Sequence, residues 1–183
     1  MNLSFFTTRK EYNRKINLGL IRDAINELSG QERVTINQRD DIILDDKWKI
    51  SGSAARLLRH ESLHHCTLLV NANIDTLNRV LSATDHIETS ATRSLRVDVK
   101  CLSDIGIDEP AKIDAPISRL WCGQYNGGVE VPIELVDPEQ VDFVLERREE
   151  LRSWKWQYGN TPRFELQTAN FVAQVAAQFR QDN

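Results

Sequence analysis

The sequence is poor in the residues that mark several large classes of protein. Only three of its 183 residues are cysteine, at Cys66, Cys101 and Cys122, and no two of them form a Cys-x-x-Cys pair. An odd, widely spaced set of thiols argues against a disulfide framework and is typical of a reducing compartment. The sequence therefore predicts free thiols rather than cross-links.

Long apolar runs and an excess of positive charge are also lacking. No apolar run is long enough to cross a bilayer, and Met1 leads into Asn2-Leu3-Ser4-Phe5 without the charged leader and apolar region of a signal or transit sequence. The formal net charge is −4, with both signs interspersed. Because general nucleic-acid binding depends on a field of positive charge, we expect neither a nucleic-acid nor a membrane partner.

What is present is a regular succession of apolar patterns and turn residues. The spacing predicts strands over residues 3–7, 34–36, 42–44, 48–55, 63–70 and 95–102, with a loop over 84–94. It predicts helices over 12–28 and 73–82, a short helix with Pro116 in its first turn, a helix after Asp137-Pro138, and one over 170–179. Thr8 and Glu11 have capping-box spacing, and Ser29-Gly30 is typical of a helix end. Short strands joined by close turns favour an α+β fold, with an antiparallel sheet flanked by helices.

One stretch combines a charged turn with a run of small residues. It contains Arg39-Asp40-Asp41, then Lys49-Ile50-Ser51-Gly52-Ser53-Ala54, and is answered by His64-His65-Cys66-Thr67-Leu68-Leu69. Lys49 opens the small-residue run, and a glycine at position 52 lets a ligand approach the backbone. This arrangement suits an anionic or carbonyl-bearing ligand. The residues alone leave open that Lys49 is solvated and that the Ser-Gly-Ser triplet is an ordinary loop.

These motifs resemble the lipoate-protein ligase and lipoyltransferase family. The His-His-Cys-Thr-Leu-Leu form most resembles its mitochondrial lipoyltransferase branch, and residues 2–8 and 151–164 agree with the family in the same order. The resemblance covers roughly residues 2–164. It implies the class II synthetase-like fold shared by biotin and lipoate ligases, an antiparallel sheet flanked by helices, and a location in mitochondria.

The resemblance also implies a reaction. A lipoyl group passes from lipoyl-adenylate, or from the lipoylated glycine-cleavage H protein, to a lysine of an acceptor lipoyl domain. The implied acceptors are the acyltransferase subunits of 2-oxoacid dehydrogenases, and the implied ligand is lipoate or lipoyl-adenylate. Because the acceptor supplies the nucleophile, the enzyme contributes positioning and charge stabilisation.

Matching the family motifs residue by residue gives the expected site. Lys49 is the catalytic residue, a cation that holds the acyl carbonyl and phosphate oxygens. The positions implied to contact lipoyl-adenylate are Arg39, Asp41, Lys49, Ser51, Gly52, Thr67, Thr92 and Ser94.

Each of these positions also has a simpler interpretation. Arg39 is equally typical of a surface charge paired with a neighbouring aspartate, Gly52 of a strand kink, and Thr67 of an ordinary strand residue. No metal site is predicted, because the adjacent residues His64 and His65 of a strand point to opposite faces.

The sequence departs from the family at both ends. We expect residues 1–165 to form part of a lipoyltransferase catalytic domain and residues 166–183 to form a divergent tail. The family's glycine-rich lipoate loop and C-terminal accessory domain have no match here, so the chain resembles a shortened catalytic domain. Two other functions stay open: a catalytically impaired fragment acting as a protein-interaction module, and a biotin-type ligase. The Trp-Lys-Trp and Tyr-Gly-Asn-Thr-Pro segments favour the lipoyl branch.

Overall fold

The computed structural model describes residues 1–82, 87–89, 97–159, 161, 164–168 and 171–175. The chain divides into two compact units: the first contains Met1–Ile74 and Arg96–Ile133, and the second contains Asp75–Leu95 and Glu134–Asn183. Every apolar side chain that is buried among the described residues belongs to the first unit. The first unit therefore holds the hydrophobic core.

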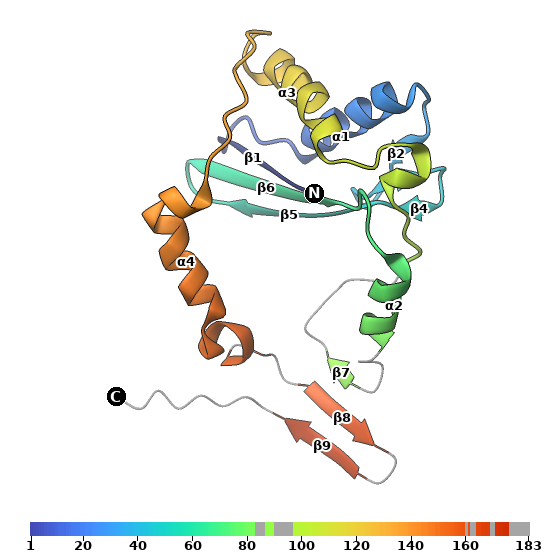
Figure 1. Ribbon diagram of the computed structural model, residues 1–183, viewed down its shortest axis with the longest axis vertical. Helices are drawn as coiled ribbons and strands as arrows, with labels where there is room; N and C mark the ends of the chain where they lie inside the picture. The colour runs from blue at the N-terminus through green and yellow to red at the C-terminus, as the bar shows by residue number, and fades with distance from the viewer. Residues whose placement is uncertain (83–86, 90–96, 160, 162–163, 169–170, 176–183) are drawn as a thin grey trace. The chain divides into compact units, whose positions relative to one another are not determined.

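A three-stranded antiparallel sheet in the order β1-β6-β5 forms one layer of the first unit (Figure 1). Its strands are β1 (Asn2–Thr8), β5 (Ser51–Leu57) and β6 (Glu61–Leu68). Burial alternates along β6: Ser62, His64, Cys66 and Leu68 face the core, and the residues between them are more exposed. This confirms the strand predicted at the N-terminus and most of the strand predicted over 63–70.

Helices α1 (Arg14–Ser29) and α3 (Ala111–Tyr125) form the second layer, packed on one face of this sheet (Figure 1). The helical spacing of Leu18, Ile21 and Ile25 places all three in the core, where they have no exposed surface. Burial of such a side chain stabilises a fold by roughly 1.5–3 kcal/mol. As predicted, α1 ends at Gly30, whose φ of 65° is the left-handed conformation that glycine tolerates.

The start of α1 differs from the prediction. Thr8 and Glu11 do make the hydrogen bonds of a capping box, with each backbone N–H donating to the other side chain at 3.3 Å. The helix nevertheless begins later, at Arg14, because the Asn13 side chain accepts hydrogen bonds from the next free N–H groups. Asparagine is among the best N-cap residues. The capping-box bonds therefore close a separate turn.

A second antiparallel sheet, in the order β2-β3-β4, is made of β2 (Val34–Ile36), β3 (Ile42–Leu44) and β4 (Trp48–Lys49). The strand predicted over 48–55 is divided between the two sheets. The division falls at Ile50, which is fully buried. Its N–H donates to the Ile42 carbonyl at 3.1 Å, and its own carbonyl accepts from the Leu69 N–H at 2.9 Å. The chain passes from one sheet to the other at this residue.

The strand predicted over 95–102 is wrong for most of the residues that the structure describes there. Val99 forms one isolated parallel bridge to Lys49, and Leu102–Ile105 is a short 3-10 helix. The alternation of apolar residues in this stretch is typical of a strand with one buried face. Val97 is instead exposed, while Leu102 is fully buried. Residues 95 and 96 lie outside the described residues. The loop predicted over 84–94 is wrong at Ile87–Thr89, which forms strand β7. The other residues of that stretch lie outside the described part of the chain.

The helix around Pro116 is longer than predicted. It begins at Ala111, so that Pro116 lies inside α3 rather than in its first turn. A proline there lacks the N–H that would bond to the preceding turn, and its ring crowds that turn. Burial of Ile113 and Ile117 in the core offsets this cost and keeps the first turns helical.

The second unit contains α2 (Ile74–Ser82) except for its first residue, α4 (Asp142–Arg152) and a sheet in the order β7-β8-β9. Strands β8 (Phe164–Thr168) and β9 (Phe171–Val175) pair as an antiparallel hairpin. The helix predicted over 170–179 is therefore wrong for residues 171–175, where aromatic and β-branched residues suit a strand with a partner beside it. The other residues of that prediction lie outside the described part of the chain.

The helix predicted after Asp137-Pro138 is confirmed, although no residue of α4 is buried. The Asp137 side chain accepts from the Glu139 N–H at 3.0 Å and starts a 3-10 turn before α4. None of the helices in the described ranges is long and apolar enough to cross a membrane.

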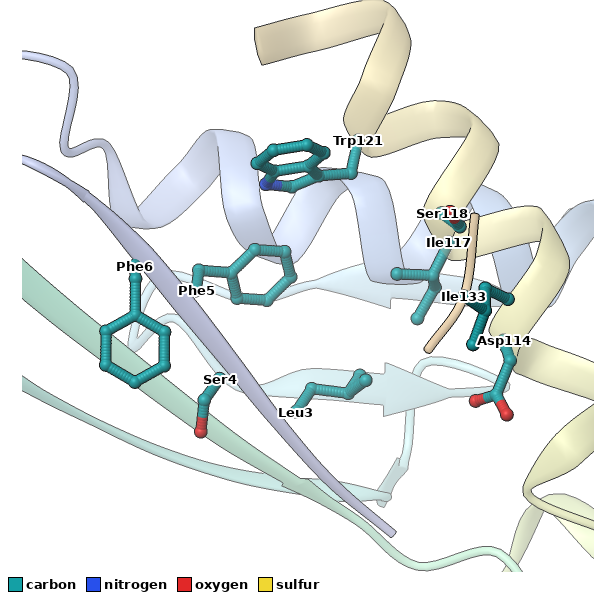
Figure 2. Close-up of a pocket in the computed structure, with 9 residues that line it drawn as sticks. All are labelled: Leu3, Ser4, Phe5, Phe6, Asp114, Ile117, Ser118, Trp121 and Ile133. Atoms are coloured by element: carbon teal, nitrogen blue, oxygen red, sulfur yellow. The ribbon is translucent and has the colours of Figure 1, made fainter. Parts of the chain in front are cut away.

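A hollow of about 390 Å³ runs beside β1 (Figure 2). It is lined by Leu3, Ser4, Phe5, Phe6, Asp114, Ile117, Ser118, Trp121 and Ile133. Leu3 and Phe5 lie on the α3 side of the strand, and Phe6 lies on the other side, where 72% of it is exposed. Among the described strands β1 pairs with β6 alone, so the hollow follows an open edge of the sheet.

Candidate functional site

The register of the second sheet decides where Lys49 points. Val34 pairs with Leu44, and Leu44 pairs with Trp48; the first two of these side chains are buried in the core. Side chains alternate between the faces of a strand, so the neighbouring row of Thr35, Ile43 and Lys49 lies on the opposite face. Core packing on one face thus holds Lys49 on the other.

The backbone of Lys49 is fixed from both sides. Ile43 of β3 is its antiparallel partner, and Val99 is its parallel partner on the other side. The Lys49 N–H donates to the Asp98 carbonyl at 3.1 Å, and its carbonyl accepts from the Lys100 N–H at 3.3 Å. A lysine held in this way presents a flexible side chain from a rigid base.

The ammonium group of Lys49 is paired with Asp41. Its Nζ lies 2.5 Å from Asp41 Oδ1, and only 25% of the Lys49 side chain and 16% of the Asp41 side chain are exposed. Such a partly buried pair is screened less than one at the surface. An ammonium has three N–H donors, so this contact leaves donors for a ligand. Two of the positions that the family resemblance implied for the site, Asp41 and Lys49, are thus in direct contact.

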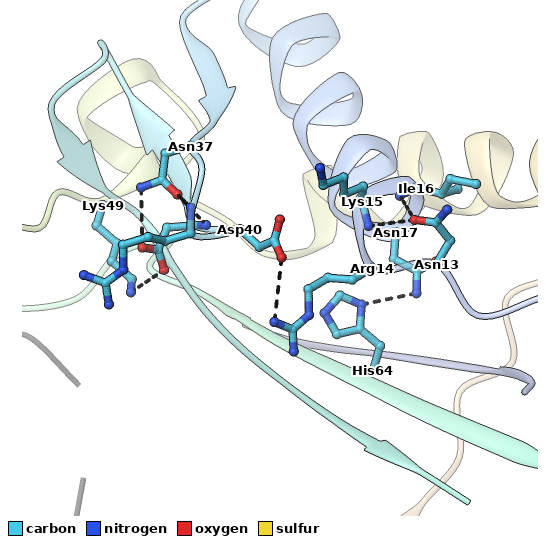
Figure 3. Close-up of polar contacts among 11 residues, drawn as sticks. Asn13, Arg14, Lys15, Ile16, Asn17, Asn37, Asp40, Lys49 and His64 are labelled. Atoms are coloured by element: carbon cyan, nitrogen blue, oxygen red, sulfur yellow. Dashed lines mark hydrogen bonds and ion pairs between the residues drawn. The ribbon is translucent and has the colours of Figure 1, made fainter. Parts of the chain in front are cut away.

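Asp41 belongs to the turn between β2 and β3, which also contains Asn37 and Asp40 (Figure 3). The side-chain Oδ1 of Asn37 accepts from the N–H groups of Arg39 and Asp41, both at 2.9 Å. Asp40 adopts a φ of 60°, which only a few non-glycine residues tolerate, aspartate among them. Its carboxylate lies 3.8 Å from Arg14 of α1, so the turn is linked to the helix as well as to β4.

These residues line a groove of about 500 Å³ on the outer face of the second sheet. Its lining consists of Thr35, Ile36, Asn37, Arg39, Asp41, Ile43, Asp46, Lys47, Lys49 and Val97. Three of the predicted site residues, Arg39, Asp41 and Lys49, are therefore brought together here. We call this the Lys49 groove.

Arg39 is exposed at the edge of the Lys49 groove. Among the residues that the structure describes, no carboxylate forms an ion pair with its guanidinium. The simpler interpretation, a surface charge paired with Asp40 or Asp41, therefore does not hold within the described chain. Those two carboxylates pair with Arg14 and Lys49 instead.

The other described candidates lie apart from the groove lining. Ser51 is buried, and its hydroxyl accepts from the Ile42 N–H at 2.9 Å, which joins the two sheets. Gly52 and Thr67 are direct partners across β5 and β6, and Gly52 is exposed. The Thr67 hydroxyl donates to Asn2 Oδ1 at 2.9 Å. Thr92 and Ser94 lie outside the described residues.

Sequence reasoning missed Asn37, Lys47 and Thr35, which also line the Lys49 groove. A signal for Asn37 was present: asparagine favours turns in which its side chain accepts backbone N–H groups a few residues ahead. Lys47 gave no such signal. Its ammonium lies 4.2 Å from the centre of the Trp48 ring, a contact that depends on the hairpin.

A separate polar network lies under β6. The buried His64 Nδ1 lies 3.2 Å from Asn17 Nδ2, and the Tyr125 hydroxyl donates to Asn17 Oδ1 at 2.7 Å. Burial, followed by the positive charge of Arg14, lowers the pKa of His64 to about 4. Burial likewise raises the pKa of Cys66 to about 12, so its thiol stays protonated at neutral pH. No group of three or more potential metal ligands occurs in the described ranges.

The geometry of the Lys49 groove suits an anionic ligand with a carbonyl group. Arg39, Lys47 and Lys49 supply positive charge, while Asp41 and Asp46 supply negative charge. A guanidinium binds two phosphate oxygens at once, and an ammonium binds as a compact point charge. The Thr35 hydroxyl in the lining donates to the Asp46 carboxylate at 3.2 Å. The charged groups of the groove suit binding, orientation and charge stabilisation.

Comparison with known families gives a match over most of the first unit. Residues 1–121 match the model of the family described as lipoyl protein ligase A/B catalytic domain. This range includes β1 to β6, the Lys49 groove and most of α3.

Individual proteins agree with this match. The chain is 33% identical over 178 residues to a human protein named lipoyl amidotransferase LIPT1, mitochondrial, a match that covers 94% of this chain and 47% of the relative. The structure of P. falciparum LipL1 in complex with lipoate has a TM-score of 0.61 at 21% identity, covering 93% of this chain and 51% of the other. A lipoate-protein ligase A bound with ATP gives 0.56 at 13% identity, with coverages of 85% and 63%. The chain spans about half the length of the curated relatives it matches.

Proposed function

Because the chain belongs to the lipoyl protein ligase A/B catalytic-domain family, we propose that it binds an activated lipoyl group at the Lys49 groove and transfers it to a protein lysine. The observation that carries the proposal is the ion pair of Lys49 with Asp41, held over a groove that Arg39 also lines. The family match covers this whole arrangement. It also favours a lipoyl substrate over the biotin of the alternative interpretation.

The proposed reaction needs only the groups that the groove provides. The amine of the acceptor lysine attacks the carbonyl carbon of lipoyl-adenylate, an amide bond forms, and the bond from that carbon to the phosphate oxygen breaks. AMP leaves with the electron pair, and the amine loses a proton to solvent. Lys49 donates hydrogen bonds to the carbonyl and phosphate oxygens, where negative charge grows in the transition state.

The remaining site residues receive supporting roles in this proposal. Arg39 binds phosphate oxygens or stacks on the adenine ring, and Asp41 holds Lys49 in place. Gly52 and Thr67 contact the acyl part from the neighbouring strands, and Ser51 keeps the two sheets together. Thr92 and Ser94 contact the nucleotide.

The partners and location follow from the family. We propose that the acceptors are lipoyl domains of 2-oxoacid dehydrogenase acyltransferase subunits, and that the donor is lipoyl-adenylate or lipoylated H protein. The name of the human relative includes mitochondria, which supports a mitochondrial location for this chain. Residues 1–165 form the catalytic part in this proposal, and residues 166–183 form a divergent tail.

A second candidate is a protein-interaction module without catalysis. The observation that favours it is the apolar hollow beside the open edge of β1, together with the exposed side chain of Phe6. An unpaired strand edge readily accepts another strand. In this case the Lys49 groove is retained from an active ancestor but has no catalytic role, and the chain binds a lipoyl domain without modifying it.

The test is transfer of a lipoyl group to an isolated lipoyl domain, followed by intact mass, with lipoyl-adenylate or lipoylated H protein as donor. We expect Lys49→Ala to slow transfer by at least about 100-fold, the usual effect of removing one such donor. The matched control is Lys112→Ala, since Lys112 Nζ also lies 2.5 Å from a carboxylate, that of Asp108, but outside the groove lining. Transfer at the wild-type rate in Lys49→Ala contradicts the proposal. Binding of the lipoyl domain without transfer from either donor favours the interaction module.

A further inference from the structure

Asn37 bonds to several residues of the turn below the Lys49 groove, although it was not among the predicted site residues. Its Oδ1 accepts from the N–H groups of Arg39 and Asp41, and its own N–H donates to the Asp41 carbonyl at 3.0 Å. The Asn37 carbonyl also accepts from the Asp40 N–H at 3.2 Å. The side chain and backbone of Asn37 thus bond to three of the four other residues of the turn.

The side-chain amide of Asn37 also reaches the carboxylate of Asp41. Its Nδ2 lies 3.5 Å from Asp41 Oδ2, a long hydrogen bond, while Oδ1 of the same carboxylate faces Lys49. The two oxygens of Asp41 are therefore shared between a neutral donor and a cation. A carboxylate held at one oxygen has little freedom to turn the other away.

We propose that Asn37 is a positioning residue for the Lys49 groove: it holds the turn and the Asp41 carboxylate in the orientation that keeps the Lys49 ammonium at the ligand. Its role in transfer rests on the proposed function of this groove. Its role in holding Asp41 against Lys49 stands without that function.

The turn has a second anchor, which separates orientation from folding. Asp40 contacts Arg14 of α1 at 3.8 Å, and the Asn37 side chain itself is exposed rather than part of the core (Figure 3). Removing the Asn37 amide therefore changes the direction of the Asp41 carboxylate more than it changes the fold.

The first experiment exchanges donor and acceptor between the two side chains. Asn37→Asp keeps an oxygen for the N–H groups of the turn but places a carboxylate against Asp41. Asp41→Asn alone removes the charge that faces Lys49. In the double variant the two side chains can again form an N–H···O bond, with its direction reversed. The measurements are the single-turnover rate of transfer at saturating lipoyl-adenylate and, separately, the dissociation constant of that ligand.

We expect each single variant to slow transfer about 10-fold with less than about a 3-fold change in the dissociation constant, since small displacements of catalytic groups act mainly on the rate. The double variant should be no slower than Asp41→Asn alone. If the rate of the double variant is reduced by the product of the two single fold-reductions, the two residues act independently. That result overturns the proposal, as does a wild-type rate in Asn37→Asp.

The chain offers a matched control in Asn13. Its Oδ1 also accepts from two backbone N–H groups, those of Lys15 and Ile16, but at the start of α1. Aspartate caps a helix as well as asparagine does. Asn13→Asp should therefore transfer within about 2-fold of the wild-type rate.

A second measurement needs no catalysis. Limited acetylation of the folded protein, followed by peptide mass spectrometry, compares the reactivity of Lys49 with that of Lys112 in the same sample. We expect Asn37→Ala to raise labelling of Lys49 several-fold, because Asp41 no longer stays against its ammonium, while Asn13→Ala leaves it unchanged. Circular dichroism confirms that each variant is folded.

The two measurements fail in different ways. In one outcome, the wild-type protein neither binds lipoyl-adenylate nor transfers the lipoyl group, but labelling of Lys49 rises in Asn37→Ala. This outcome refutes the proposed function and retains Asn37 as the residue that holds Asp41. Unchanged labelling of Lys49 in a folded Asn37→Ala protein overturns the inference, whatever the activity. If Asn37→Ala does not fold, the exchange of positions 37 and 41 decides alone.

Discussion

Among single residues, His64 shows how burial sets chemistry in this fold. Its ring has no exposed surface, is stacked on Phe5 and meets the edge of Tyr12. Nδ1 accepts from Asn17, so the neutral ring carries its hydrogen on Nε2, which has no hydrogen-bond partner among the described residues. A second proton would have to enter at Nδ1, against an N–H donor. The neutral ring is therefore the form that packs.

This predicts that acid destabilises the protein through His64. The pKa of His64 is about 4 when folded, below the ordinary value of 6.5, so the unfolded chain binds more protons between these values. The stabilising contribution is complete above about pH 6.5 and is lost as the pH falls towards 4. Urea unfolding should show that His64→Gln reduces the loss of stability between pH 7 and pH 5 by about 2 kcal/mol.

The control for this prediction is His65→Gln. His65 is the next residue of β6 and lies on the opposite face, where its Nδ1 is 3.2 Å from the Ser4 hydroxyl. The variant leaves His64 in place and should keep the wild-type loss between the two pH values. Equal losses in wild-type and His64→Gln proteins would mean that His64 does not titrate with folding.

At the same scale, the sequence predicted part of the candidate site. The resemblance to the family motifs implied one site for Arg39, Asp41 and Lys49, and all three line the Lys49 groove. The same resemblance implied Ser51 as a ligand contact, but Ser51 is buried between the sheets, since the chain changes sheet at Ile50. No local pattern marks such a change, because it depends on two strands that are distant in sequence.

Among the elements, the β3–β4 hairpin contains two residues in a strained backbone conformation. Its two central residues, Asp45 and Asp46, have φ of 52° and 54°, and the Lys47 N–H donates to the Leu44 carbonyl at 3.2 Å. Turns of this kind match the twist of paired strands but favour glycine or asparagine. Asp45 is compensated by two hydrogen bonds from Arg33, at 2.7 and 2.8 Å, whereas Asp46 receives one from the Thr35 hydroxyl at 3.2 Å.

Asp46→Gly should therefore stabilise the protein, by about 0.5–1 kcal/mol, because glycine adopts this conformation without a steric cost. Thermal unfolding measures the effect. Asp45→Gly is the comparison: it relieves the same strain but loses both bonds to Arg33, so its gain should be smaller or absent. A lower melting temperature for Asp46→Gly than for Asp45→Gly would contradict the argument.

The elements also show which sequence patterns are reliable. Strands β2 and β3 and the end of α1 at Gly30 were predicted correctly, because their signals are local. The helix over 170–179 failed in the described strand β9, because its Phe and Val residues pair with β8, which propensity alone does not reveal. The early start of α3 was missed because a buried Ile113 outweighs an internal proline.

On the scale of the whole molecule, the core is unevenly shared. The first unit buries side chains from its sheets and both of its helices, while α4 in the second unit buries none. Phe143, Leu151 and Trp156 are each about half exposed or more, at 62%, 48% and 53%. The segment Asp75–Leu95 of the second unit also interrupts the first unit in sequence.

Hydrogen exchange should follow this division. We expect amides of α1 to exchange at least about 100-fold more slowly than those of α4, because a helix without buried residues opens locally at little cost. Exchange measured by mass spectrometry on peptides from residues 14–29 and 142–152 tests this. Equal protection of both helices would show that α4 is held by contacts other than burial.

The parallel bridge between Lys49 and Val99 has a consequence for the order of synthesis. The backbone groups of Lys49 find their last partners, Asp98 and Lys100, about fifty residues later in the chain. At a ribosomal rate of about 5–20 residues per second, this delay is roughly 2.5–10 seconds. During this interval the strand that carries Lys49 has an unpaired edge, so the base of the Lys49 groove is completed only after residues 98–100 have been made.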